Sequence, residues 1–121
     1  SIHELPFENE KFDYITAFDF IEHVPRIIYL PKQRLPFVEL MNEVHRCLKS
    51  DGIFLSWTPV YPFLTAFRDP THVNVIAPDT FAMYFCYPLR AAGMYGFKGG
   101  FELVDQFLFE SHLVTLLRKA R

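Results

Sequence analysis

The sequence has little cysteine and no long apolar run. Cys47 and Cys86 are the only cysteines among 121 residues, and neither belongs to a CxxC pair. We expect both to be reduced, buried side chains of a cytoplasmic protein rather than a disulfide or a metal pair. No apolar stretch approaches the ~20 residues of a membrane span, and the first residues do not have the pattern of a signal peptide. We therefore expect no membrane partner.

The sequence also lacks an excess of charge of either sign. Its net charge is −2 at pH 7, and its isoelectric point is near 6.2. This balance gives no electrostatic basis for binding nucleic acid. Half of the residues are hydrophobic, including 14 Phe and 6 Tyr. That composition is sufficient for a core, and the length indicates a single domain over residues 1–121.

A strand predicted at Phe12–Phe18 ends at a cluster of ionisable groups. Its continuous apolar and β-branched sequence suits a strand that is covered on both faces, as in a parallel sheet between helices. Asp19, Glu22 and His23 follow within five residues. Ligands of open α/β sheets bind outside the carboxyl ends of the strands. The stretch therefore has the layout of a site.

Hydrophobic spacing and turn residues predict the other elements. In chain order they are an amphipathic helix over Pro36–Lys49, a turn at Asp51-Gly52, a buried strand at Ile53–Trp57, a helix that starts at Pro78, and strands at Phe101–Glu110 and His112–Arg118 joined by a tight turn at Ser111. The prolines between Val24 and Pro36 exclude a long helix there. The glycines from Gly93 to Gly100 indicate a flexible connection and not a phosphate loop.

Two long segments resemble a known family. Leu5–Val24 reads LPFENEKFDYITAFDFIEHV, and Glu39–Val60 reads ELMNEVHRCLKSDGIFLSWTPV. Both are similar to the middle of class I S-adenosylmethionine-dependent methyltransferases, most closely the small-molecule type of ubiquinone biosynthesis. The resemblance covers nearly the whole chain. It implies an α/β, Rossmann-like methyltransferase fold that is partial: the C-terminal half, with parallel strands followed by a terminal antiparallel hairpin.

The sequence has no counterpart of the family's glycine-rich cofactor loop or of the acidic residue that holds the ribose. Both precede the part of the fold that the chain resembles. The resemblance implies that a larger parent protein transfers a methyl group from S-adenosylmethionine to a small-molecule acceptor. This chain alone is expected to bind the cofactor weakly or not at all, and to be inactive. The alternative, from a different class, is a non-catalytic binding or assembly module that retains a remnant of the fold.

The same resemblance implies which residues contact the cofactor. Ala17, Phe18 and Asp19 would line its methionine end. Ile2 and His3 would offer backbone groups and an apolar wall to its adenine. These five positions follow from the match to the family and not from spacing alone.

The acceptor side needs alignment and, for a hydroxyl group, a base. Histidine is the residue type suited to that role near neutral pH. His23 is the first candidate and His72 the second, while Glu22 and Arg68 are expected to bind the substrate. Arg68 and His72 together suit an anionic or phenolic molecule. The structural alternative is that Glu22 begins a turn and His23 packs or caps nearby.

Two further alternatives concern the loop that contains His72. Asp69 and Thr71 can cap local backbone groups, because they are turn formers. A metal site is conceivable from four residues, namely Asp19, Glu22, His23 and His72. Their spacing matches no motif such as HExxH, so no metal is expected.

The strand at Phe12–Phe18 also raises the question of partners. In the family's sheet the matching strand is internal. Without the preceding strands one of its edges lacks a partner, and a long apolar edge is a template for pairing with another chain. We expect self-association, most simply as a two-fold dimer. In the alternative, Ser1–Lys11 or the proline-rich stretch folds back over the edge.

Overall fold

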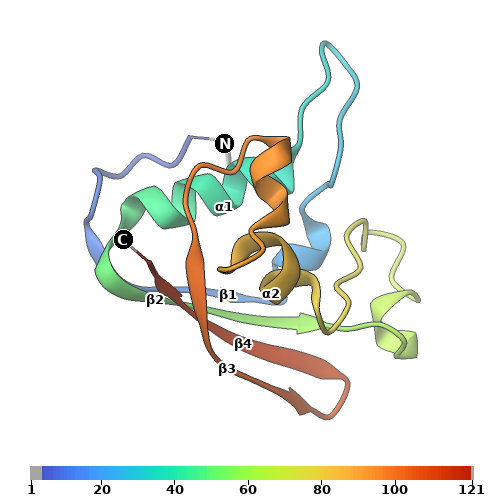
Figure 1. Ribbon diagram of the computed structural model, residues 1–121. Coiled ribbons are helices and arrows are strands. Elements are labelled where there is room, and N and C mark those ends of the chain that lie inside the picture. The colour runs from blue at the N-terminus through green and yellow to red at the C-terminus, as the bar shows by residue number, and fades with distance from the viewer. Residues whose placement is uncertain (1–3, 121) are drawn as a thin grey trace.

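The computed structural model describes residues 4–120, which form a four-stranded sheet with its helices on one face (Figure 1). The strand order is β1-β2-β4-β3. β1 (Phe12–Phe18) runs parallel to β2 (Leu48–Pro59), and β4 (His112–Lys119) runs antiparallel to β2 and to β3 (Phe101–Phe109). The predicted parallel pair and the predicted terminal hairpin are both confirmed.

The main helix, α1 (Pro36–Cys47), begins where its sequence indicates. Pro36 occupies the first turn, where its missing N–H is tolerated. One face is buried against the sheet, through Phe37, Leu40, Met41, Val44 and Cys47. The helix ends two residues before the predicted Lys49, because Leu48 adopts an extended conformation and opens β2. Among residues 4–120, none of the helices is long and apolar enough to cross a membrane.

The other elements are α2 (Thr80–Phe85) and three short 3-10 turns, η1 (Ile21–His23), η2 (Leu64–Ala66) and η3 (Ala91–Tyr95). Of these, α2 and η3 pack on the same face of the sheet as α1 (Figure 1). Phenylalanine rings connect α1, α2 and the residue that follows η3: centroids lie 5.2 Å apart for Phe37 and Phe85, and 5.1 Å for Phe85 and Phe97. The core therefore lies between the sheet and one layer of helices.

β2 starts earlier than predicted and contains a bulge. Leu48 pairs with Phe12 while Ile53 pairs with Tyr14, so four residues of β2 lie opposite Asp13 alone. Asp51 has a φ of 64°, and a Cβ on Gly52 would lie 2.8 Å from the carbonyl oxygen of Lys49. The predicted Asp51-Gly52 turn is thus present, as an irregularity within the strand.

The two cysteines are free and buried, as expected. Cys47 lies in α1, and Cys86 follows α2. Burial raises the pKa of Cys86 to about 11. Its thiol is therefore protonated at neutral pH, and the thiol form is a poor nucleophile and metal ligand.

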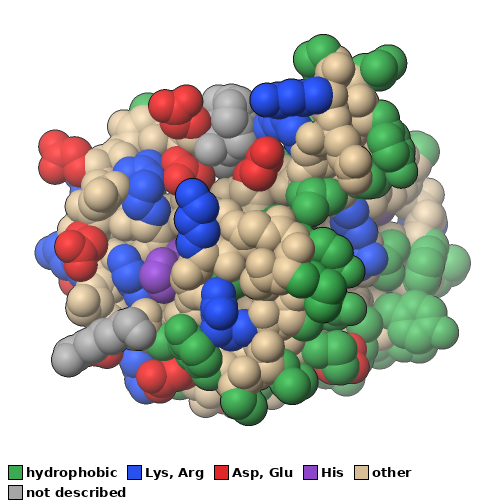
Figure 2. Space-filling model, turned by 45° about the horizontal axis from the view of Figure 1, so that its top comes forward, with side chains coloured by type: hydrophobic (Ala, Val, Ile, Leu, Met, Phe, Trp, Pro, Cys, Tyr) green, Lys and Arg blue, Asp and Glu red, His purple; other side chains and the backbone are tan. Residues whose placement is uncertain are grey.

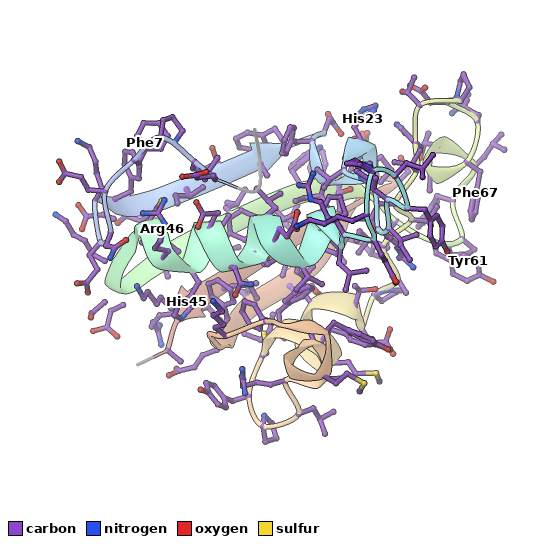
Figure 3. All side chains as sticks on the ribbon, turned by 90° about the horizontal axis from the view of Figure 1, so that it is seen from above. Phe7, His23, His45, Arg46, Tyr61 and Phe67 are labelled. Carbon is purple, nitrogen blue, oxygen red and sulfur yellow. The ribbon has the colours of Figure 1, made fainter. Side chains whose placement is uncertain are left out.

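The segment before β1 runs across the end of α1, where Arg46 holds it. The Arg46 guanidinium donates to Glu43, to the carbonyl oxygens of Leu5 and Phe7, and to Asn9. Glu43 in turn accepts a hydrogen bond of 2.8 Å from the Leu5 amide. Figure 3 shows Phe7 and Arg46 together at this end of the helix. The described part of the segment is therefore attached to α1, and the Phe7 ring also packs edge-to-face on Phe12 of β1, with centroids 5.0 Å apart.

The proline-rich stretch forms a small hairpin that projects away from the sheet (upper right in Figure 1). Ile28 and Arg34 exchange backbone hydrogen bonds of 2.9 and 2.7 Å. Arg34 also forms an ion pair with Glu39 of α1, at 2.7 Å. In the described part of the chain, no strand lies beside the outer edge of β1.

The face of the sheet opposite the helices is largely apolar and open. On β1 its side chains are those of Tyr14 (73% exposed) and Phe18 (59%). Phe107 and Phe109 of β3 are about half exposed as well. The continuous apolar sequence of β1 predicted cover on both faces, but the described residues cover only one.

Candidate functional site

The chain leaves β1 through a residue in the left-handed region. Asp19 has a φ of 50°, and its amide donates to the carbonyl oxygen of Trp57 over 2.8 Å. η1 follows at once and is anchored by Ile21, which is completely buried in the core. The turn consequently directs Glu22 inward, at 2% exposed, and leaves the side chain of His23 39% exposed.

The loop that follows β2 folds back over η1. The carbonyl oxygen of Glu22 accepts hydrogen bonds from the amides of Val73 (2.8 Å) and Asn74 (3.1 Å). The buried Asn74 side chain donates to the Ile21 carbonyl at 3.3 Å and accepts from Arg26 at 2.5 Å. These contacts place the loop over the carboxyl ends of β1 and β2.

Asp69 and Thr71 form the turn within this loop. One carboxylate oxygen of Asp69 accepts from the Thr71 amide (2.9 Å) and from its hydroxyl (2.7 Å). The two hydrogen bonds from Thr71 lower the pKa of Asp69. The alternative prediction, that one of these residues serves the local backbone, is confirmed for Asp69. Their turn sets the position of the residue that follows, His72.

His23 and His72 lie against each other, with ring centroids 4.9 Å apart in an edge-to-face arrangement. Nδ1 of His23 is 3.2 Å from the carbonyl oxygen of Thr71, and Nδ1 of His72 is 3.1 Å from that of Ala66. A carbonyl oxygen can only accept, so each Nδ1 carries a hydrogen. In the neutral rings both Nε2 atoms therefore have a free lone pair.

Glu22 adds a buried carboxylate to the pair. Its Oε1 accepts a hydrogen bond of 3.1 Å from the Thr58 hydroxyl, and its Oε2 lies 3.9 Å from Nε2 of His23. One ligand atom from each of Glu22, His23 and His72 lies within 4.8 Å of the other two. We refer to these three residues as the His23 cluster. The structure thus assembles three predicted site residues from two distant segments.

Asp19 does not join this cluster. Its Oδ1 is 2.8 Å from Nε2 of His112, the first residue of β4. The His112 ring lies beside Trp57 on the open face of the sheet, at 5.4 Å between centroids. Glu22, by contrast, binds Thr58 on the helix-covered face. The two carboxylates therefore belong to different faces.

The remaining predicted residues are also dispersed. Ala17 is buried in the core, whereas the Phe18 ring lies on the open face, 6.4 Å from Trp57. Arg68 is exposed on the loop. Ile2 and His3 lie outside the described residues.

Residues that sequence reasoning missed complete the site. Thr58 binds the Glu22 carboxylate, Asn74 fixes the loop, and His112 binds Asp19. Thr58 belongs to the alternation of β2, which could have indicated that it faces the core. The roles of Asn74 and His112 have no local signal, because their partners are 53 and 93 residues away.

An apolar surface lies at the same end of the molecule as the His23 cluster. Tyr61 and Phe67 are each about half exposed, and their rings are 6.1 Å apart. Figure 3 shows both at the end where His23 lies, and Figure 2 shows hydrophobic side chains gathered on that side of the molecule (right of the view). Exposed apolar patches of this kind mark binding surfaces.

A comparison with protein families agrees with the fold. Residues 1–56 match the family model described as a methyltransferase domain. The match covers 56 of the 121 residues, slightly less than half of the chain, and shows similarity to that family. The matched region includes β1, η1, α1 and most of β2, and so contains Glu22 and His23 but not His72. None of the curated proteins in the comparison matches the chain.

Solved structures show the same fold. The [4+2]-cyclase SpnF is 16% identical with a TM-score of 0.66, and 98% of this chain covers 53% of that one. PH0226 protein from Pyrococcus horikoshii is 17% identical with a TM-score of 0.63, and 99% of this chain covers 57% of it. A protein from Bacillus halodurans, provisionally described as a methyltransferase, is 14% identical with a TM-score of 0.64, at 100% and 70% coverage. The chain thus spans little more than half of the first two structures.

The methyltransferase domain family uses S-adenosylmethionine. The described residues at the end of β1 do not form a site that fits this cofactor. Phe18 turns to the open face of the sheet, and Asp19 is bound to His112. Among residues 4–120 we therefore assign no side chain to binding the methyl donor.

Proposed function

We propose that this chain forms the acceptor side of an S-adenosylmethionine-dependent methyltransferase that acts on a small molecule. The observation that carries this proposal is the pairing of His23 and His72 beside a parallel strand pair, in a chain with methyltransferase-domain sequence and fold. Such strand ends are where open α/β sheets bind ligands. The fold alone is insufficient, because a fold hosts many activities.

His23 is the proposed base. Its side chain is 39% exposed, against 9% for His72, so an acceptor hydroxyl can approach it. The Thr71 carbonyl holds its Nδ1–H, which leaves Nε2 to take up the proton. The carboxylate of Glu22, 3.9 Å away, stabilises the imidazolium that results. His72 packs against the ring and fixes its orientation.

The proposed acceptor is an aromatic hydroxyl compound with an apolar substituent, as the resemblance to the ubiquinone-biosynthesis type implies. The exposed rings of Tyr61 and Phe67 suit the apolar part. Arg68, exposed on the same loop, suits an anionic group such as a carboxylate or phenolate.

The test is methyl transfer by the complete protein in which residues 1–121 occur. It would be incubated with methyl-labelled S-adenosylmethionine and a panel of phenols and hydroquinones that differ in their alkyl substituent. We expect label on acceptors that have both a free hydroxyl and an apolar substituent. The matched controls are the same compounds with every hydroxyl already methylated. Cofactor binding without transfer to any acceptor would instead favour a non-catalytic binding module.

We also propose that the isolated chain pairs with a second copy through the outer edge of β1. The edge of β3 is interrupted by a register shift and carries Glu102 and Asp105, features that protect edges. On β1 the register shift and the single charge both fall at Asp13, near the start of the strand, where the carboxylate lies 3.8 Å from Nζ of Lys49 of the same chain; residues 14–18 are regular and uncharged. Two copies related by a two-fold axis can therefore pair antiparallel without like charges meeting at the centre.

A double variant tests this pairing. The Asp19 amide points toward β2, where it donates to Trp57. Amides of successive strand residues point to opposite edges, so the Thr16 amide, three residues earlier, points to the outer edge. Tyr14→Lys with Thr16→Pro should block the outer edge and leave the β2 ladder intact. We expect light scattering at high concentration to give about twice the monomer mass for the native chain and the monomer mass for this variant. Tyr29→Lys on the projecting hairpin is the control, and should remain dimeric.

A dimer that survives the double variant would contradict edge pairing. If Phe107→Lys on the open face of the sheet then produced monomers, the copies would associate through that face. A native chain that is strictly monomeric would show that the edge is covered from within.

A further inference from the structure

Two imidazoles and a buried carboxylate converge in the His23 cluster without matching a metal-binding sequence motif. Glu22 and His23 are adjacent in the chain, while His72 is 49 residues beyond His23. The fold alone brings their ligand atoms within 4.8 Å of one another. We propose that Glu22, His23 and His72 bind one divalent transition-metal ion such as Zn²⁺.

The hydrogen bonds of the two rings support this assignment. Histidines that bind a metal through one nitrogen almost always donate the other N–H to a carbonyl or carboxylate, which fixes the tautomer and the ring orientation. Both rings show this pattern, with Nδ1 of His23 toward the Thr71 carbonyl and Nδ1 of His72 toward the Ala66 carbonyl. The nitrogen left for a ligand is Nε2 in each case.

The carboxylate completes the donor set. Glu22 is 2% exposed, and the Thr58 hydroxyl binds its Oε1, so Oε2 remains for a metal. A buried carboxylate is stabilised by a cation, because burial otherwise disfavours its charge. Two imidazoles and one carboxylate, with a fourth position for water, are a common ligand set for Zn²⁺. Mg²⁺ and Ca²⁺ prefer oxygen ligands, so this set suits them poorly.

The distances require a small contraction. Bonds of about 2.0–2.2 Å in a tetrahedral site place neighbouring ligand atoms roughly 3.3–3.6 Å apart. Oε2 of Glu22 and Nε2 of His23 are 3.9 Å apart. Metal binding therefore requires the partly exposed His23 ring to move toward Glu22, and requires all three ligand atoms, which lie within 4.8 Å of one another, to come closer together. Asp69, whose Oδ2 lies 3.7 Å from Nε2 of His72, is positioned to stabilise the bound cation.

Binding of Zn²⁺ does not depend on the proposed function, but its effect on methyl transfer does. Nε2 of His23 cannot hold a metal ion and accept a proton at the same time. The metal-loaded protein would therefore lack its base, and Zn²⁺ would inhibit methyl transfer.

Calorimetric titration of residues 1–121 with Zn²⁺ alone, without cofactor or acceptor, tests the binding. We expect micromolar or tighter binding of one Zn²⁺ per chain and no binding of Mg²⁺. His23→Asn and His72→Asn should each weaken binding by at least about 10–100-fold, a loss that even outer-shell partners of a metal site cause. His112→Asn, which removes a histidine from the opposite face of the sheet, is the matched control and should leave the affinity unchanged.

Histidine side-chain ¹⁵N resonances provide a second measurement, which also separates misfolding from loss of a ligand. Zn²⁺ should shift Nε2 of His23 and His72 while both Nδ1–H signals remain. Absence of Zn²⁺ binding by the native chain would overturn the proposal. So would binding that His23→Asn and His72→Asn leave unchanged, or binding that His112→Asn abolishes. Because no acceptor is present, failure here would leave the proposed methyl transfer untouched.

Discussion

Replacing His23 by asparagine should lower kcat for methyl transfer by about 10²–10⁴-fold, the range typical of a lost general base. Asparagine keeps a polar side chain of similar reach but cannot take up the proton. KM should change little, because the apolar surface of Tyr61 and Phe67 remains. The measurement is steady-state kinetics of the complete protein with a chelator present, so that no metal occupies the ring.

The pH profile distinguishes a base from a residue that only supports the structure. In the native protein kcat should fall in acid, since a protonated imidazole cannot accept a proton. His23→Asn should lose this acidic limb, whereas a merely destabilised protein would keep it. His45→Phe is the matched control. That ring packs against Phe101 on the helix-covered side, with centroids 5.3 Å apart, and burial lowers its pKa.

His72→Asn should have a smaller effect on kcat, because His72 is assigned to positioning. Its side chain is 9% exposed and its Nδ1–H is held by Ala66. A larger loss from His72→Asn than from His23→Asn would exchange the two roles. If neither variant changes kcat, the assignment of the base is wrong.

Elements with a strong hydrophobic period were predictable from the sequence. β1 and the β3–β4 hairpin have the predicted positions, because alternation and turn residues are local signals. The start of β2 was not predictable in the same way. Lys49–Gly52 reads as a helix stop and a turn, yet the chain keeps the strand direction through a bulge opposite Asp13. Whether such a turn ends a strand or interrupts it depends on the neighbouring strand.

The main side chains of the candidate site were predictable, but their contacts and the groups that orient them were not. The sequence indicated Glu22 and His23 at a strand end, and His72 as a second candidate base. The contact between the two histidines depends on the backbone bonds from Val73 and Asn74 to Glu22. The groups that orient the rings are backbone carbonyls, which every residue possesses. No sequence pattern can therefore reveal them.

Asp19 shows the limit of reasoning from neighbours in sequence. It precedes Glu22 by three residues, and the two were expected to lie at the same strand end, Asp19 toward the cofactor and Glu22 toward the substrate. Its left-handed backbone, which aspartate tolerates better than most residues, turns the side chain to the opposite face of the sheet. There it meets His112, 93 residues further along the chain. The left-handed φ of Asp19 thus separates its carboxylate from that of Glu22, although the two residues are close in sequence.

Residues 1–121 alone should show no saturable binding of S-adenosylmethionine up to about 1 mM, equivalent to a binding free energy weaker than about −4 kcal/mol. The resemblance implies three sets of cofactor contacts, and the glycine-rich loop and the ribose acid have no counterpart in this sequence. The third set is incomplete among the described residues, because Phe18 faces the open side of the sheet and Asp19 is bound to His112. Without a loop of backbone N–H groups, the charged methionine end has few donors to receive it.

Isothermal titration calorimetry on the isolated chain measures this directly, with S-adenosylhomocysteine as a second ligand that lacks the sulfonium charge. The control is the complete protein that contains these residues, which should bind both ligands at micromolar concentration if the proposed function holds. Micromolar binding by residues 1–121 would overturn the prediction. In that case the cofactor affinities of Asp19→Asn and His112→Asn should be compared. If the cofactor displaces His112 from Asp19, it should bind His112→Asn more tightly than the native chain, because the hydrogen bond of 2.8 Å between the two residues no longer competes.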